Sequence, residues 1–95
     1  MGLNQIMASS LKDAIAKMGY EISAKNEESV LIQKKDELAT ILILFHKKDK
    51  DIFGAIKTNK LIYTLDEISR QYAIFREMKE DLKTFKQLSG HGIID

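Results

Sequence analysis

Few side chains in this sequence have the type and spacing that catalysis or metal binding requires. The two histidines, His46 and His91, belong to no His-x-x-x-His or Glu-x-x-His pattern, which would place two ligands on one face of a helix. The chain has no cysteine, so it has neither thiolate ligands nor disulfides. We therefore predict no metal site and no cofactor.

Three pairs of adjacent acidic residues are the next groups that could act as acids or bases: Glu27–Glu28, Asp36–Glu37 and Asp66–Glu67. Each pair lies at a predicted turn or at the predicted start of a helix, where hydration or the helix dipole accounts for it. No serine lies in a Gly-x-Ser-x-Gly motif, and no helix follows the Gly90–Gly92 segment to form a phosphate site. We therefore expect a protein that is not an enzyme and has no catalytic residues.

Lysines cluster in the segments that are expected to be turns. One cluster follows the central apolar segment and consists of Lys47, Lys48 and Lys50, while the lysines of segments 34–35 and 57–60 belong to the opposite end of the predicted sheet. The whole chain has 15 basic and 14 acidic residues, a net charge of +1 that gives no general attraction to nucleic acid. Nucleic-acid binding through Lys47, Lys48 and Lys50 is therefore only the second, alternative function of the two that we consider; the first, protein interaction, is given below.

The segment 38–45 is expected to be the strand around which the fold is organised. It carries no formal charge and lies between two charged segments, 34–37 and 46–51. In a strand, Leu42 and Ile43 point to opposite faces, and each face of this segment is apolar. Such a segment is typical of a strand buried on both sides. If both faces are covered, Leu42→Ala and Ile43→Ala should each lower the free energy of unfolding by about 2–5 kcal/mol.

The other strands are predicted from alternating or apolar segments that short turns separate. They are expected at 20–25, 29–34, 52–56 and 60–64. In the first of them Tyr20, Ile22 and Ala24 alternate with polar residues, a half-buried pattern. Gly54 indicates a bulge or a close approach by another backbone or a bulky ring. The connections are too short for helical crossovers, so neighbouring strands should be antiparallel. The predicted fold is α+β, with an antiparallel meander sheet of about five strands between an N-terminal and a C-terminal helix.

The N-terminal helix has two possible starting points. One apolar stripe runs from Leu3 to Met18, and Gly19 then fits the left-handed position that follows a helix. Alternatively, Ser10 begins the helix as its cap, which leaves residues 3–9 to form an edge strand. We favour the longer helix because its stripe continues through Ser10.

The C-terminal helix is the longest predicted element and changes the direction of its apolar side. Thr64 and Glu67 match a capping box at its start, and Gly90 marks its end. The residues from Leu65 to Phe75 set one face, which we expect to cover the sheet. At 100° per residue, a second group points in another direction: Ile74, Met78, Leu82 and Phe85. Either the helix curves around the core and these residues cover the far edge of the sheet, or they form a protein interface, which is the interpretation we favour.

Composition and length define the general class. We expect a single domain over 1–95, with 44% hydrophobic residues and no apolar segment of the roughly 20 residues that cross a bilayer. The first residues lack a signal-peptide pattern, so we expect a cytoplasmic protein with no membrane association. The predicted function is a non-enzymatic protein-interaction module that forms a homodimer, or binds another protein, through the C-terminal helix.

Three short segments, near the two ends of the chain, resemble a known family. Leu11–Ile22 reads as a helix that ends in a Met-Gly-Tyr turn and enters a strand, and Gln71–Ala73 and Gly92–Ile94 lie near the other end. They are similar to small proteins of undefined biochemical role that are encoded in plastids, cyanobacteria and other bacteria. The Gln-Tyr spacing here is one residue shorter, and the interval to the glycine is longer. The resemblance implies no activity, and it implies that Ile93 and Ile94 add a final strand.

Overall fold

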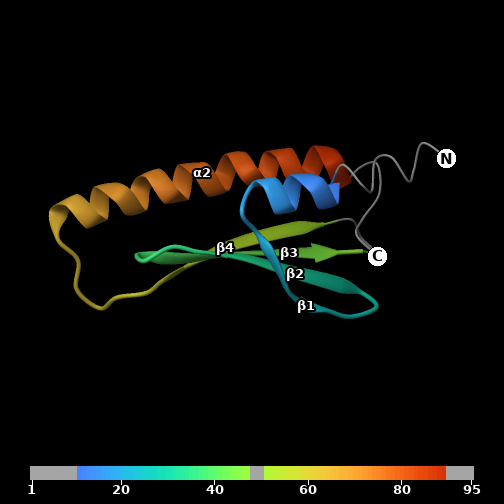
Figure 1. Ribbon diagram of the computed structural model, residues 1–95, viewed down its shortest axis with the longest axis horizontal. Helices are drawn as coiled ribbons and strands as arrows, with labels where there is room; N and C mark the ends of the chain where they lie inside the picture. Colours follow the sequence, from blue (N-terminus) through green and yellow to red (C-terminus); the bar gives the residue numbers. More distant parts are fainter. Residues whose placement is uncertain (1–10, 48–50, 90–95) are drawn as a thin grey trace.

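A computed structural model describes residues 11–47 and 51–89, which form an α+β fold with two helices on one face of an antiparallel sheet (Figure 1). A short helix over residues 11–17 comes first. The sheet has the order β1-β2-β3-β4 and is a meander of sequence neighbours. Its strands and the long helix that follows have these bounds: β1 Glu21–Lys25, β2 Ser29–Lys35, β3 Ala39–His46, β4 Ile52–Thr58 and α2 Leu65–Ser89.

The described residues form four strands, so the prediction of about five was too high. Segment 60–64, which was expected to be a strand, is instead the loop that connects β4 to α2. The Tyr63 hydroxyl donates a hydrogen bond to the Leu38 carbonyl (2.9 Å) and so holds this loop at the end of the sheet. The predicted strand that contains Ile93 and Ile94 lies outside the described residues, as does the choice between helix and strand for residues 3–9.

Glycine and short polar side chains set the turns. Gly19 ends the first helix with φ +84°, and the Tyr20 amide donates to the Ile15 carbonyl at 2.9 Å, which confirms the predicted C-terminal glycine. The Asn26 side chain accepts hydrogen bonds from the amides of Glu28 and Ser29, both at 2.8 Å, in the turn between β1 and β2. These local contacts account for the antiparallel order of the strands.

The core lies between the helices and one face of the sheet. β3 contributes the buried side chains Ile41, Ile43 and Phe45 to this face. The other members of the core come from β2, β4 and both helices, and they include Leu11, Ile15, Val30, Ile32, Ile52, Met78 and Phe85. Both helices lie on the same side of the sheet (Figure 1), so they cover one of its two faces.

The opposite face of the sheet is open in the described part of the chain. Leu42 and Leu44 of β3 point to it and are only half-buried, and Phe53 of β4 is 58% exposed. The expectation that β3 is covered on both faces therefore fails at Leu42 and Leu44 within residues 11–47 and 51–89, although Leu38 and Thr40, at the start of the same side, are buried. Two helices of this chain cover only one face of a four-stranded sheet.

A buried hydrogen bond joins the end of the first helix to α2. The Tyr20 hydroxyl donates to Asp81 Oδ2 at 2.8 Å, and the Tyr20 ring packs edge-on against Phe85 with a centroid distance of 5.4 Å. Burial raises the pKa of the Asp81 carboxyl and, together with the bond to Asp81, the pKa of the Tyr20 hydroxyl. Beyond Tyr20 the half-buried pattern predicted for β1 was wrong, because all five residues of this edge strand are exposed.

Candidate functional site

The two halves of α2 present different apolar surfaces, as the sequence predicted, but the second half faces the sheet. Phe85 is fully buried and Met78 is buried, while Ile74 and Leu82 pack against the core from half-buried positions. The four residues of the predicted interface therefore lie within the chain's own packing. A partner could reach all four only if α2 left the sheet, and the proposals below use other residues.

Gly54 of β4 explains why the second half of α2 lies on the sheet. A Cβ atom at this position would be 2.5 Å from Met78 Cε and 2.8 Å from Leu82 Cδ1, closer than real Cβ contacts. The glycine thus makes room for two large side chains of α2. The sequence predicted a bulge or a close approach by another backbone or a bulky ring at Gly54. A close approach is present, but the approaching groups are the side chains of Met78 and Leu82, and β4 keeps an unbroken register with β3.

The first half of α2 presents its apolar side chains to solvent. Four of them form one line along the helix, which we call the exposed stripe: Leu65, Ile68, Tyr72 and Phe75. The Tyr72 side chain is 67% exposed and that of Phe75 is 43% exposed. Two further apolar residues precede the helix, and Leu61 and Ile62 are 103% and 87% exposed. This is an apolar surface of the kind that another molecule covers.

A groove runs between the exposed stripe and strand β4. Its volume is about 440 Å³, and we call it the β4 groove; its lining residues are Ile56, Thr58, Ile68, Gln71, Tyr72 and Phe75. No lining residue carries a formal charge. The Gln71 Nε2 atom is buried and has no hydrogen-bond acceptor among the described residues. The uncharged lining of the groove therefore suits a largely apolar partner.

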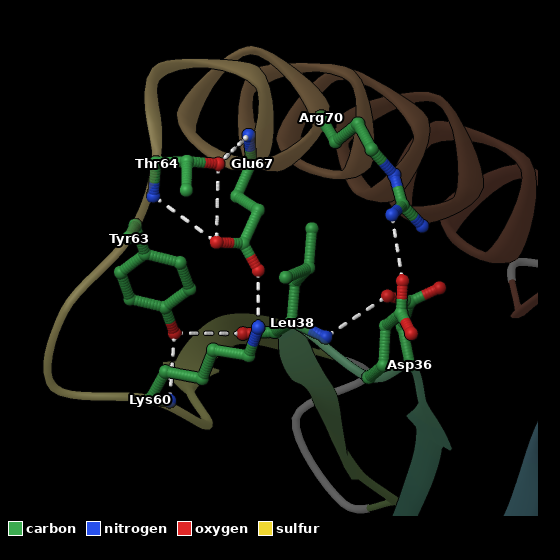
Figure 2. Close-up of polar contacts among 8 residues, drawn as sticks. Asp36, Leu38, Lys60, Tyr63, Thr64, Glu67 and Arg70 are labelled. Carbon is green, nitrogen blue, oxygen red and sulfur yellow. Dashed lines mark hydrogen bonds and ion pairs between the residues drawn. The ribbon is translucent and has the colours of Figure 1, made fainter.

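A capping box fixes the start of α2 and the position of the stripe (Figure 2). The Thr64 amide donates to Glu67 Oε1 at 3.0 Å, and the Glu67 amide donates to Thr64 Oγ1 at 3.2 Å. The second carboxylate oxygen of Glu67 pairs with the Lys60 ammonium. The hydrogen bond from Lys60, and after it the bond from the Thr64 amide, lower the pKa of Glu67 to about 2. The predicted capping box is confirmed.

The loop before α2 is tied to the sheet by further hydrogen bonds. The Tyr63 hydroxyl accepts from the Lys60 amide at 2.8 Å while it donates to Leu38, as Figure 2 shows. The Asn59 side chain donates to the Asp36 carbonyl at 2.7 Å, and Arg70 pairs with Glu37 at 2.6 Å one turn into the helix. The exposure of Leu61 and Ile62 is therefore a fixed feature of the surface.

Removing the Thr64 side-chain oxygen should test this anchor. We expect Thr64→Ala to lower the free energy of unfolding by about 1 kcal/mol, because the Glu67 amide loses its acceptor.

Glu67→Gln is the matched change on the other half of the capping box. Since the folded state lowers the pKa of Glu67, its carboxylate stabilises the fold at neutral pH, and this contribution disappears as the pH falls from about 4.5 to about 2. Denaturant titrations at pH 7 and pH 2 should show Glu67→Gln less stable than wild type only at pH 7. An unchanged midpoint for Thr64→Ala would contradict the capping role.

The structure describes one of the three lysines of the alternative function. Lys47 is half-buried at the end of β3, and Lys48 and Lys50 lie outside the described residues. Towards the other end of the sheet, Lys34 pairs with Glu77 at 2.9 Å and Lys60 pairs with Glu67. These acidic partners reduce the positive charge there. Nucleic-acid binding stays a prediction.

Residues 11–47 and 51–89 contain no group of three or more His, Asp or Glu side chains placed to hold a metal ion. His91 lies outside these ranges. Within the same ranges, neither helix combines the length and the apolar character that crossing a membrane requires.

Comparison of the chain with protein-family models, with curated proteins and with solved structures finds no match. The resemblance to the plastid and cyanobacterial family stays a prediction.

Proposed function

We propose that this protein is a non-enzymatic protein-interaction module that self-associates through the first half of α2. The observation that carries the proposal is the exposed stripe, in which four large apolar side chains lie in one line on a helix that has its other apolar side on the sheet. A helix with a second apolar side needs a second cover. The fixed loop and the capping box hold this surface in one position before any partner arrives, which lowers the entropic cost of binding.

A second copy of the chain fits this surface well. In a two-fold dimer the same surface of both copies takes part, so the exposed stripe of each copy would lie against the second copy. The rings of Tyr72 and Phe75 together expose about 200 Å² at the fractions observed, and aromatic side chains are enriched at the centres of interfaces. A standard interface buries about 800 Å² on each partner, and the aliphatic residues of the stripe and the β4 groove can supply the rest together with the exposed Leu61 and Ile62.

The stripe also has a charged border, as interfaces commonly have. The Lys79 ammonium lies 4.6 Å from the centroid of the Phe75 ring, one turn further along the helix. Lys83 and Lys86 follow on the same side. The apolar contact would therefore end at Phe75, with lysines at its rim.

The test is the mass per particle in solution. We expect wild type to be a dimer at high micromolar concentration, and Tyr72→Glu to weaken the dimer by about 30-fold or more while far-UV dichroism is kept. The reason is that a carboxylate at the centre of the stripe must lose its hydration when the copies associate.

Ala73→Glu is the control, because it adds the same charge at an exposed position about 100° away around the helix. It should leave the dimer intact. A monomeric wild type would remove the proposal, and so would equal effects of the two substitutions.

One observation favours the alternative function. On the open face of the sheet, the His46 and Phe53 rings lie edge to face with a centroid distance of 5.6 Å, and Lys47 follows His46 directly. An exposed ring beside lysines is a feature of single-strand binding surfaces. Retention on single-stranded DNA that falls steeply with salt would support nucleic-acid binding through Lys47, Lys48 and Lys50.

A further inference from the structure

Strand β4 presents a free edge of backbone groups. The amide of Asn59 donates to the Leu38 carbonyl at 3.0 Å, and that of His46 donates to the Asp51 carbonyl at 2.8 Å. Hydrogen-bonded pairs alternate along an antiparallel ladder, so residues 53, 55 and 57 direct their backbone groups to β3. Residues 52, 54, 56 and 58 direct theirs away from the sheet, where no further strand of the described chain lies.

The two edges of the sheet differ in their protection against pairing. β1 has a bulge between Ile22 and Ala24 and carries a charge at each end, Glu21 and Lys25. β4 pairs with β3 in an unbroken register over seven residues, and its only charge is Lys57. Bulges and charges are the usual means by which proteins keep edge strands from pairing. β4 has no bulge and only one charged residue.

We propose that β4 pairs antiparallel with β4 of a second copy, so that two four-stranded sheets join into one sheet of eight strands. The inference rests on the proposed self-association and specifies its geometry. α2 contacts both β4 and β3 and lies on one face of the sheet, so in the joined sheet the two α2 helices would lie on the same face, one on each side of the two-fold axis (Figure 1).

The side chains that line the β4 groove also favour pairing of β4 with a second copy. It lies between the exposed stripe and β4, so its apolar lining would be enclosed when a second β4 and a second α2 arrive together. Pairing of all seven residues places Ala55 opposite Ala55 of the second copy and Phe53 opposite Lys57. The exposed Phe53 ring would then meet an ammonium group, and no two like charges would face each other.

A single cysteine tests this arrangement, because the natural chain has none. Residue 55 would form a pair without backbone hydrogen bonds on the two-fold axis, with the Cα atoms about 4.5 Å apart, a distance that a disulfide can span. Under mild oxidation, we expect most of the Ala55→Cys protein to become a covalent dimer on a non-reducing gel. Ser23→Cys, an exposed position on the other edge strand, is the control and should stay mainly monomeric on the same gel.

The outcomes separate this inference from the function on which it rests. If wild type is a dimer and Tyr72→Glu is not, but Ala55→Cys crosslinks no better than Ser23→Cys, strand pairing is overturned while self-association stands. That result would also be obtained if another segment of the same chain occupied the edge of β4. A monomeric wild type overturns both proposals.

Discussion

Replacing Phe85 by alanine should lower the free energy of unfolding by about 3–5 kcal/mol, the usual loss when a buried phenylalanine is truncated. The Phe85 side chain is fully buried near the end of α2. Its ring lies edge-on to Tyr20 and to Phe45, with centroid distances of 5.4 and 5.9 Å. The substitution would remove both aromatic contacts and leave a cavity where the two helices meet the sheet. A urea titration monitored by dichroism measures the loss.

Phe75→Ala is the matched control, because it makes the same chemical change on the same helix. The Phe75 side chain is 43% exposed, so we expect a loss of about 1 kcal/mol or less in the monomer. Both variants should be measured at protein concentrations low enough to keep the chain monomeric, since Phe75 also belongs to the proposed interface. Equal losses would show that the first half of α2 packs on the sheet, as the sequence alone predicted.

The two halves of α2 show what periodicity can and cannot determine. The positions of Tyr72 and Met78 on a helix fix the angle between their side chains, and this angle revealed the change of direction. Periodicity does not say which direction points to the sheet, since both groups contain large apolar residues. The answer depends on Gly54, which accommodates Met78 from across the chain. A single sequence does not reveal that pairing.

The local hydrogen bonds were predicted correctly, because each of them joins residues that are close together in the sequence. The contacts at Gly19 and between Thr64 and Glu67 join residues at most five positions apart, so the residue types at those spacings are sufficient signals. Segment 60–64 has the composition of a strand, yet Tyr63 bonds to the carbonyl of Leu38, far away in the sequence. Nothing in the local pattern indicates that contact. The predicted fifth strand failed because tertiary contacts overrode propensity.

For strand β3, the sequence predicted one feature correctly and another wrongly. Its apolar character correctly placed it inside the sheet, between β2 and β4. The same character predicted cover on both faces, whereas the described helices cover only one (Figure 1). Leucines on the second face are compatible with a half-buried sheet surface, because neighbouring side chains such as Leu31 and Leu44 are cross-strand partners and shield each other. An apolar strand is therefore weaker evidence for two covers than its composition implies.

The adjacent residues Leu42 and Ile43 measure this difference directly. Ile43 is fully buried under the helices, and we expect Ile43→Ala to lower the free energy of unfolding by about 2–5 kcal/mol. Leu42 points to the open face and is half-buried, so Leu42→Ala should lose only about 1 kcal/mol. The two changes affect neighbouring positions of one strand, and both remove aliphatic carbons, which makes each the control for the other. Denaturant titration of both variants measures the two losses. The slope of the free energy of unfolding against denaturant concentration should equal that of wild type, so that the two losses can be compared. Two equally large losses would mean that a further part of the chain, or a partner, covers Leu42 in solution.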